Sequence, residues 1–135
     1  EIEFNIQIGR YTVNGKIDRV EQNPDGDYVI IDYKTGGKNK EIENLNESLQ
    51  LNIYAMALEV NKKFGKLPKL VSYFYPEKEG QQIFSYEVTQ ADIDNTKRKL
   101  EEFLNLIDNG EFGADPNMKK CGWCDYKDLC DESQA

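Results

Sequence analysis

The pentapeptide Asn-Pro-Asp-Gly-Asp at residues 23–27 constrains the fold more strongly than any other stretch of the sequence. Proline fixes its own φ, glycine accepts a positive φ, and aspartate side chains bond to nearby backbone groups, so the segment is typical of a tight turn. Before it, apolar and polar residues alternate over residues 4–8 and 11–17, which predicts two strands. We expect an antiparallel hairpin that joins a strand ending near Glu21 to a strand at residues 28–34.

The rest of the chain alternates between helical and extended patterns. Residues 29–31 are continuously apolar, which predicts a central strand covered on both faces. Apolar residues three and four apart predict a helix over residues 45–64. Two short strands follow, at residues 70–75 and 83–88, and then a capped helix that ends near Gly110. This order predicts an α/β fold with a small mixed central sheet flanked by helices.

Composition narrows the class of protein further. The 135 residues fit one domain, which we place at residues 1–110, followed by a polar, cysteine-bearing tail at 111–135. No apolar run is long enough to cross a membrane. Seventeen basic and 25 acidic residues give a net charge of −8, which argues against coating nucleic acid by bulk charge. Histidine chemistry is excluded, and the start at Glu1 without a leader leads us to expect a piece of a longer protein.

Two carboxylates and a lysine are the candidate chemical groups. On paired antiparallel strands Asp18 and Asp32 come opposite or nearly so, while Asp32 and Lys34, two residues apart, share one face. Close carboxylates repel unless one is protonated or a cation joins them. A hard ion such as Mg²⁺ suits such oxygen ligands, and a neighbouring lysine can orient water or offset charge on a phosphate.

A simpler interpretation of Asp-x-Lys is an exposed salt bridge at a strand edge, which contributes about 0–1 kcal/mol. The surrounding residues favour a functional site instead. Asp32 directly follows a buried-looking apolar run, Asp18 lies on the partner strand, and Gln50 and Tyr54 are four residues apart on one face of the next helix.

Three motifs, in this order and spacing, resemble the RecB-like branch of the PD-(D/E)xK nuclease superfamily. They are Gly-Lys-Ile-Asp-Arg at residues 15–19, Asp-Tyr-Lys-Thr-Gly at residues 32–36, and a helical stretch that begins Gln-Leu-Asn-Ile-Tyr at residues 50–58. The resemblance implies a restriction-endonuclease-like core whose N-terminal part is missing here. The site residues that it implies are Asp18, Asp32, Lys34, Gln50 and Tyr54, with Asp18, Asp32 and the backbone carbonyl of Tyr33 as metal ligands.

The same resemblance implies a reaction and partners. We expect Mg²⁺- or Mn²⁺-dependent hydrolysis of DNA phosphodiester bonds by an exonuclease of DNA repair or recombination, with a helicase domain or subunit as partner. Lys38 and Lys40 follow the Asp-x-Lys strand and are the candidate phosphate contacts. Many relatives add a ligand, often histidine, from an upstream helix. Because this chain has no histidine, we expect it to bind metal weakly on its own.

Cys121, Cys124 and Cys130 have the spacing C-x₂-C-x₅-C. Three cysteines within ten residues fit a disulfide framework poorly, which favours a reducing, cytoplasmic setting. Structural zinc prefers four ligands, and unliganded thiols are the simplest alternative. The spacing resembles the iron–sulfur, AddB-like subgroup of these nucleases, which implies a [4Fe-4S] cluster in the full-length protein, completed by an upstream cysteine and absent from this chain.

The sequence leaves three functions open. The first is a nuclease, favoured because Asp18, Asp32 and Lys34 are all present. The second is a catalytically inactive, nuclease-like DNA-binding or scaffold module. The third is a small metal-binding structural domain built on the cysteines, which leaves the aspartates and the lysine unexplained.

Overall fold

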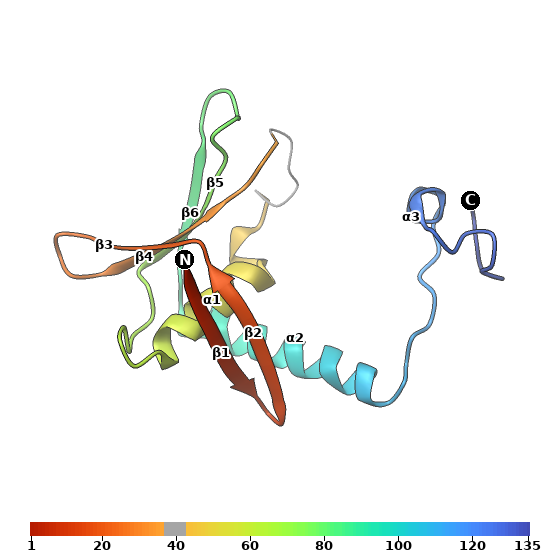
Figure 1. Cartoon of the computed structure of the whole chain (residues 1–135), viewed down its shortest axis with the longest axis horizontal. Helices are drawn as coiled ribbons and strands as arrows, with labels where there is room; N and C mark the ends of the chain where they lie inside the picture. Colours follow the sequence, from red (N-terminus) through yellow and green to blue (C-terminus); the bar gives the residue numbers. More distant parts are fainter. Residues whose placement is uncertain (37–42) are drawn as a thin grey trace. The chain divides into compact units, whose positions relative to one another are not determined.

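The computed structural model describes residues 1–36 and 43–135, and Lys38 and Lys40 lie outside the described residues. The chain divides into two compact units, Glu1–Glu102 and Phe103–Ala135 (Figure 1). The expected boundary between residues 110 and 111 stays a prediction. In the described ranges, the helices are too short or too polar to cross a membrane.

The first unit begins with a hairpin of β1 (Ile2–Ile8) and β2 (Tyr11–Ile17). The strands are antiparallel, with Phe4 opposite Gly15. Gly9 has φ +59°, as the two-residue loop of a hairpin requires. Alternate residues face inward, as the sequence pattern predicts, and β1 packs against the first α-helix.

A mixed four-stranded sheet follows in the order β3-β4-β5-β6. Its strands are β3 (Arg19–Gln22), β4 (Tyr28–Tyr33), β5 (Leu70–Phe74) and β6 (Ile83–Glu87). β4 is antiparallel to β3 and parallel to β5, and β5 is antiparallel to β6. In the turn between β3 and β4, Asn23 Oδ1 accepts from the Asp27 N–H at 2.9 Å and Gly26 has φ +86°. The predicted hairpin and mixed sheet are both confirmed.

The crossover between the parallel strands β4 and β5 carries α1 (Leu49–Val60), which packs on both strands (Figure 1). The predicted start at residue 45 is wrong for the α-helix, because η2 (Leu45–Glu47) is a separate 3₁₀ turn and the extended Ser48 caps α1. The helix also ends earlier than residue 64, since Asn61 adopts an extended conformation.

Only one face of β4 is fully covered within the described residues. Ile30 is completely buried. Val29 and Ile31 point to the opposite face and are half-buried. The expectation that both faces of residues 29–31 are covered therefore holds for one face only.

The last helix of the first unit, α2 (Gln90–Asp108), starts with the predicted cap and ends two residues before Gly110, continuing into the second unit. Thr89 Oγ1 donates to Asp92 Oδ2 at 2.7 Å, and the Asp92 N–H returns a bond to Thr89 Oγ1 at 3.2 Å. A buried polar contact joins α1 to α2, where Asn52 Nδ2 donates to Thr96 Oγ1 at 3.0 Å. The second unit also contains α3 (Met118–Trp123).

Candidate active site

The two predicted carboxylates meet where β2, β3 and β4 come together. Asp18 is the single residue between β2 and β3, and the strand register, with Arg19 opposite Ile31, extends to place it opposite Asp32. The backbone N–H of Tyr33 donates to Asp18 Oδ2 at 3.0 Å. The hairpin therefore fixes the Asp18 side chain against the end of β4.

Asp32 is a buried carboxylate with an unused acceptor. Its residue is 3% exposed. Lys34 Nζ lies 2.9 Å from Asp32 Oδ2 as an ion pair, yet this oxygen has no hydrogen-bond donor with proper angles among the described residues. Burial raises the pKa of Asp32, and the charge of Asp18 raises it further, while Lys34 lowers it.

Lys34 is held from several sides. Its backbone N–H donates to the Phe74 carbonyl at 2.8 Å, so the chain stays paired with β5 at this point. Its ammonium donates to Gln50 Oε1 at 2.7 Å, in addition to the ion pair with Asp32. The Lys34 side chain thus connects the sheet to α1. Its ion pair with Asp32 agrees with the prediction that these two residues share one face.

Gln50 and Tyr54, on neighbouring turns of α1, complete this arrangement. Gln50 Nε2 donates to the Tyr54 hydroxyl at 3.0 Å. The orientation of the amide follows from chemistry, because an ammonium only donates and the carbonyl oxygen of Gln50 must face Lys34. Burial and the charge of Asp32 raise the pKa of Tyr54, which keeps this phenol protonated.

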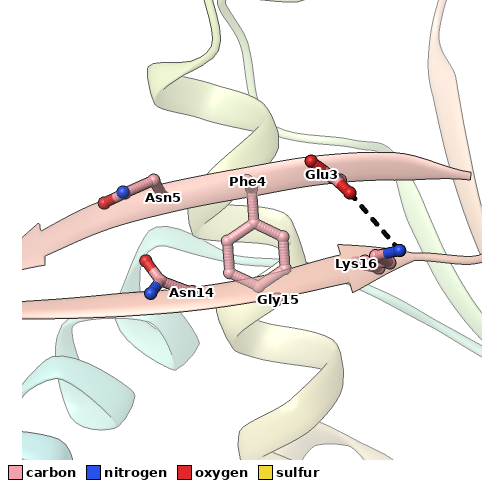
Figure 2. A pocket seen from close by; sticks show the side chains of 6 residues that line it. All are labelled: Glu3, Phe4, Asn5, Asn14, Gly15 and Lys16. Carbon is pink, nitrogen blue, oxygen red and sulfur yellow. Dashed lines mark ion pairs between the residues drawn. The ribbon is translucent and has the colours of Figure 1, made fainter.

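The glycine of the first motif makes room for an aromatic ring (Figure 2). A Cβ at Gly15 would fall 2.5 Å from Cζ of Phe4, its cross-strand partner. The Phe4 ring meets the Tyr54 ring edge-on, with 5.8 Å between centroids. The β1–β2 hairpin therefore supports the face of α1 that carries Gln50. A hollow of about 490 Å³ lies over the same pair, lined by Glu3, Phe4, Asn5, Asn14, Gly15 and Lys16.

Sequence reasoning missed two residues that contact this group. The Tyr73 hydroxyl donates to Gln50 Oε1 at 3.4 Å and lies 2.7 Å from Ser48 Oγ. Ser48 Oγ also accepts from the Leu51 N–H at 3.2 Å and so caps α1. The cap signal was present in the sequence, since serine is a favoured N-cap. Tyr73 had no local signal, because its place depends on the register of β5 against β4.

Comparison with known proteins gives the family. The family model of the PD-(D/E)XK nuclease superfamily matches residues 1–131 of the chain. The chain belongs to this superfamily. Its mixed sheet with packed helices fits the restriction-endonuclease-like fold of that superfamily, as predicted.

Three relatives extend the comparison. The chain is similar to the Gene 69 protein of Mycobacterium phage L5, at 29% identity over 96% of this chain and 43% of that protein. It is also similar to the CRISPR-associated exonuclease Cas4 of Saccharolobus solfataricus, at 22% identity over 95% of this chain and 56% of that protein. The crystal structure of SSO0001 has the same fold, with a TM-score of 0.52 and 19% identity over 96% of this chain and 57% of that one. The chain thus spans about half the length of these relatives.

PD-(D/E)XK nucleases generally use divalent metals, and two carboxylates of this chain fit such an ion. Asp32 Oδ2 is buried, its ion pair with Lys34 lacks hydrogen-bond geometry, and the charge of Asp18 acts on the same carboxyl group. Hard ions take oxygen ligands of this kind and complete their shell with carbonyl groups and water. No group of three metal-ligating His, Cys, Asp or Glu side chains occurs in residues 1–36 and 43–135. The role of the Tyr33 carbonyl as a ligand stays a prediction.

The predicted cysteine site lies in the second unit. Cys121, Cys124 and Cys130 are free thiols that line one cavity of about 230 Å³. They do not form a metal-holding group in the part of the chain that the structure describes. The iron–sulfur assignment therefore stays a prediction.

Proposed function

We propose that this chain is the catalytic core of a DNA nuclease that hydrolyses phosphodiester bonds with Mg²⁺ or Mn²⁺. The observation that carries the proposal is the Asp32 carboxylate, buried beside Asp18 with an oxygen that has no hydrogen-bond donor in the described residues. Burying a carboxylate beside a second one costs free energy that the ion pair with Lys34, at 2.9 Å, offsets only in part, since the pKa of Asp32 is still raised by burial. That cost is offset when the oxygen binds a cation, and a lysine beside it suits phosphate chemistry.

The residues would divide the work as follows. Asp18, Asp32 and the Tyr33 carbonyl hold the metal ion, which when bound supplies an activated water and a polarised phosphate. Lys34 places its ammonium beside the reacting phosphate and stabilises the charge that develops there. Gln50 fixes the direction of that ammonium through its 2.7 Å bond.

Further features of the proposal concern the substrate and its delivery. We infer exonuclease action, which the similarity to the exonuclease Cas4 supports, and we propose a role in DNA repair or recombination. Tyr54, Lys38 and Lys40 are the proposed DNA contacts. Since the chain carries a net charge of −8, a helicase domain or subunit is proposed to deliver the strand. In the full-length protein, Cys121, Cys124 and Cys130 would hold three corners of an AddB-like [4Fe-4S] cluster, in the reducing setting of the cytoplasm.

A cleavage assay tests the proposal directly. The full-length protein is incubated with single- and double-stranded DNA and Mg²⁺ or Mn²⁺, beside its Asp32→Asn and Lys34→Met variants. We expect metal-dependent cutting that each substitution reduces by about 100-fold or more, since one removes a proposed metal ligand and the other removes the charge beside the reacting phosphate. Lys16→Met is the matched control, because Lys16 also pairs with a carboxylate, Glu3 at 3.3 Å, but on the outer side of the hairpin.

The alternative function, an inactive DNA-binding or scaffold module, predicts a different pattern. The full-length protein would then bind DNA without cutting it in either metal, and Asp32→Asn would leave binding unchanged. Cutting that persists at the normal rate in Lys34→Met would also refute the active-site assignment.

A further inference from the structure

Tyr73, on β5, contacts the lysine of the proposed active site. It pairs with Asp32 in the parallel register of β4 and β5 and is only 3% exposed. Lys34 Nζ lies 5.0 Å from the centroid of its ring, which is within the range of a cation–π interaction. Its hydroxyl contacts Gln50 and Ser48. One side chain thus meets the lysine, the amide that holds the lysine, and the residue that caps α1.

The hydrogen bonds of this group run from Lys34 to the start of α1. Lys34 donates to Gln50 Oε1 at 2.7 Å, and the Tyr73 hydroxyl lies 3.4 Å from the same oxygen. The Tyr73 hydroxyl and Ser48 Oγ are 2.7 Å apart, and either oxygen can be the donor. Ser48 Oγ also accepts from the Leu51 N–H. These contacts connect the ammonium of Lys34 to the N-cap of α1 through Gln50 and Tyr73.

We propose that Tyr73, anchored by Ser48, is a positioning residue that holds Lys34 and Gln50 in the arrangement that DNA cleavage requires. This inference rests on the proposed nuclease function. Lysine has a flexible four-carbon stem, so an ion pair with Asp32 alone leaves the direction of its ammonium open. The Tyr73 ring limits the ammonium on one side, while the Tyr73 hydroxyl and Ser48 tie Gln50 to the start of α1. A displacement of 1 Å in such a site can lower the rate by about 100-fold.

Kinetics of two substitutions separate the ring from the hydroxyl. Tyr73→Phe keeps the ring and loses both hydrogen bonds, so we expect kcat to fall about 10-fold. Tyr73→Leu loses the ring as well, and we expect a fall of about 100-fold. KM should stay within about twofold in both, because the DNA contacts are unchanged. Ser48→Ala should resemble Tyr73→Phe, and Ser48→Thr, which restores a hydroxyl and a cap, should rescue kcat.

Tyr86→Phe is the matched control for a purely structural effect. The Tyr86 hydroxyl is also bonded to α1, but to Asn52 Oδ1 on the side that faces α2. Its loss should lower the melting temperature and leave kcat within about twofold. If Tyr73→Phe lowers kcat no more than Tyr86→Phe at a similar loss of melting temperature, the positioning role is refuted.

An NMR measurement decides the placement of Lys34 without relying on activity. The Lys34 ε-methylene protons near the Tyr73 ring should resonate upfield, and Lys34→Met identifies their signal. We expect the upfield shift to persist in Tyr73→Phe and to disappear in Tyr73→Leu. An unshifted signal in the unsubstituted protein overturns the inference, whatever the activity. A shifted signal in a protein that cuts no DNA supports the placement and overturns the proposed function instead.

Discussion

At the scale of single residues, the Asp32 carboxylate that the proposed reaction requires lowers the stability of the metal-free fold. Its side chain is buried and its pKa is raised, first by desolvation and then by Asp18, against the lowering effect of Lys34. A raised pKa means that the folded state binds the Asp32 proton more tightly than the unfolded state does. The ionised carboxylate therefore lowers the stability of the metal-free protein at neutral pH.

We expect Asp32→Asn to stabilise the metal-free protein at pH 7 while abolishing cleavage. Below the unfolded pKa of aspartate, about 3.9, Asp32 is protonated in both states and the difference should vanish. As pH rises through the raised folded pKa, the wild type loses stability that the variant keeps. Melting temperatures measured from pH 3 to 7 in EDTA check this. Asp27→Asn is the control, since Asp27 sits in a more exposed ion pair, 3.8 Å from Lys66. A variant less stable than the wild type at pH 7 would contradict the argument.

The charged residues of this site could be predicted from the sequence, but the residues that hold them in place could be predicted only in part. Asp18, Asp32 and Lys34 could be placed together because a turn fixes the hairpin register and alternation fixes the face. Helical spacing placed Gln50 on one face with Tyr54, and the family resemblance added both to the site. Tyr73 could not, since the pairing of β5 with β4 closes only after a connection of more than 30 residues, and no local pattern sets that register.

At the scale of secondary-structure elements, the β1–β2 hairpin acts as a support for α1. Phe4 covers the backbone of Gly15 and its ring packs on Tyr54. The alternation of apolar and polar residues predicted both strands of this hairpin. The start of α1 was predicted too early, because apolar spacing continues through residues 45–47 while the backbone forms a 3₁₀ turn that stops at the extended Ser48.

Gly15→Ala should therefore destabilise the protein, because its Cβ would lie 2.5 Å from Phe4 Cζ. Overpacking of this kind costs about 1–3 kcal/mol. Urea unfolding measures the loss, and Phe4→Leu in the same chain should recover part of it, since a smaller side chain relieves the clash. Gly113→Ala is the control, because a Cβ there meets no atom within 4 Å. Equal losses for both glycines would refute a specific role for the Phe4–Gly15 contact.

At the scale of the whole molecule, the candidate active site and the three cysteines belong to different units. The candidate active site lies within Glu1–Glu102, and all three cysteines lie within Phe103–Ala135. The acidic composition, 25 acidic against 17 basic residues, limits the phosphate contacts that drive binding to DNA. Both facts agree with the proposal that other parts of a longer protein deliver the DNA to this site.

The cysteines give the last prediction, because a cluster with four cysteine ligands cannot be completed by three. We expect the 135-residue chain to purify with almost no iron or sulfide, and the full-length protein to contain both. Cys121→Ser in the full-length protein should remove most of the iron. Because the candidate active site lies in the other unit, the unfolding of residues 1–102 should change little in the same variant. Iron and sulfide assays, with urea unfolding followed by tryptic mapping, measure both effects. Stoichiometric iron in the 135-residue chain would refute the proposal that an upstream cysteine supplies the fourth ligand.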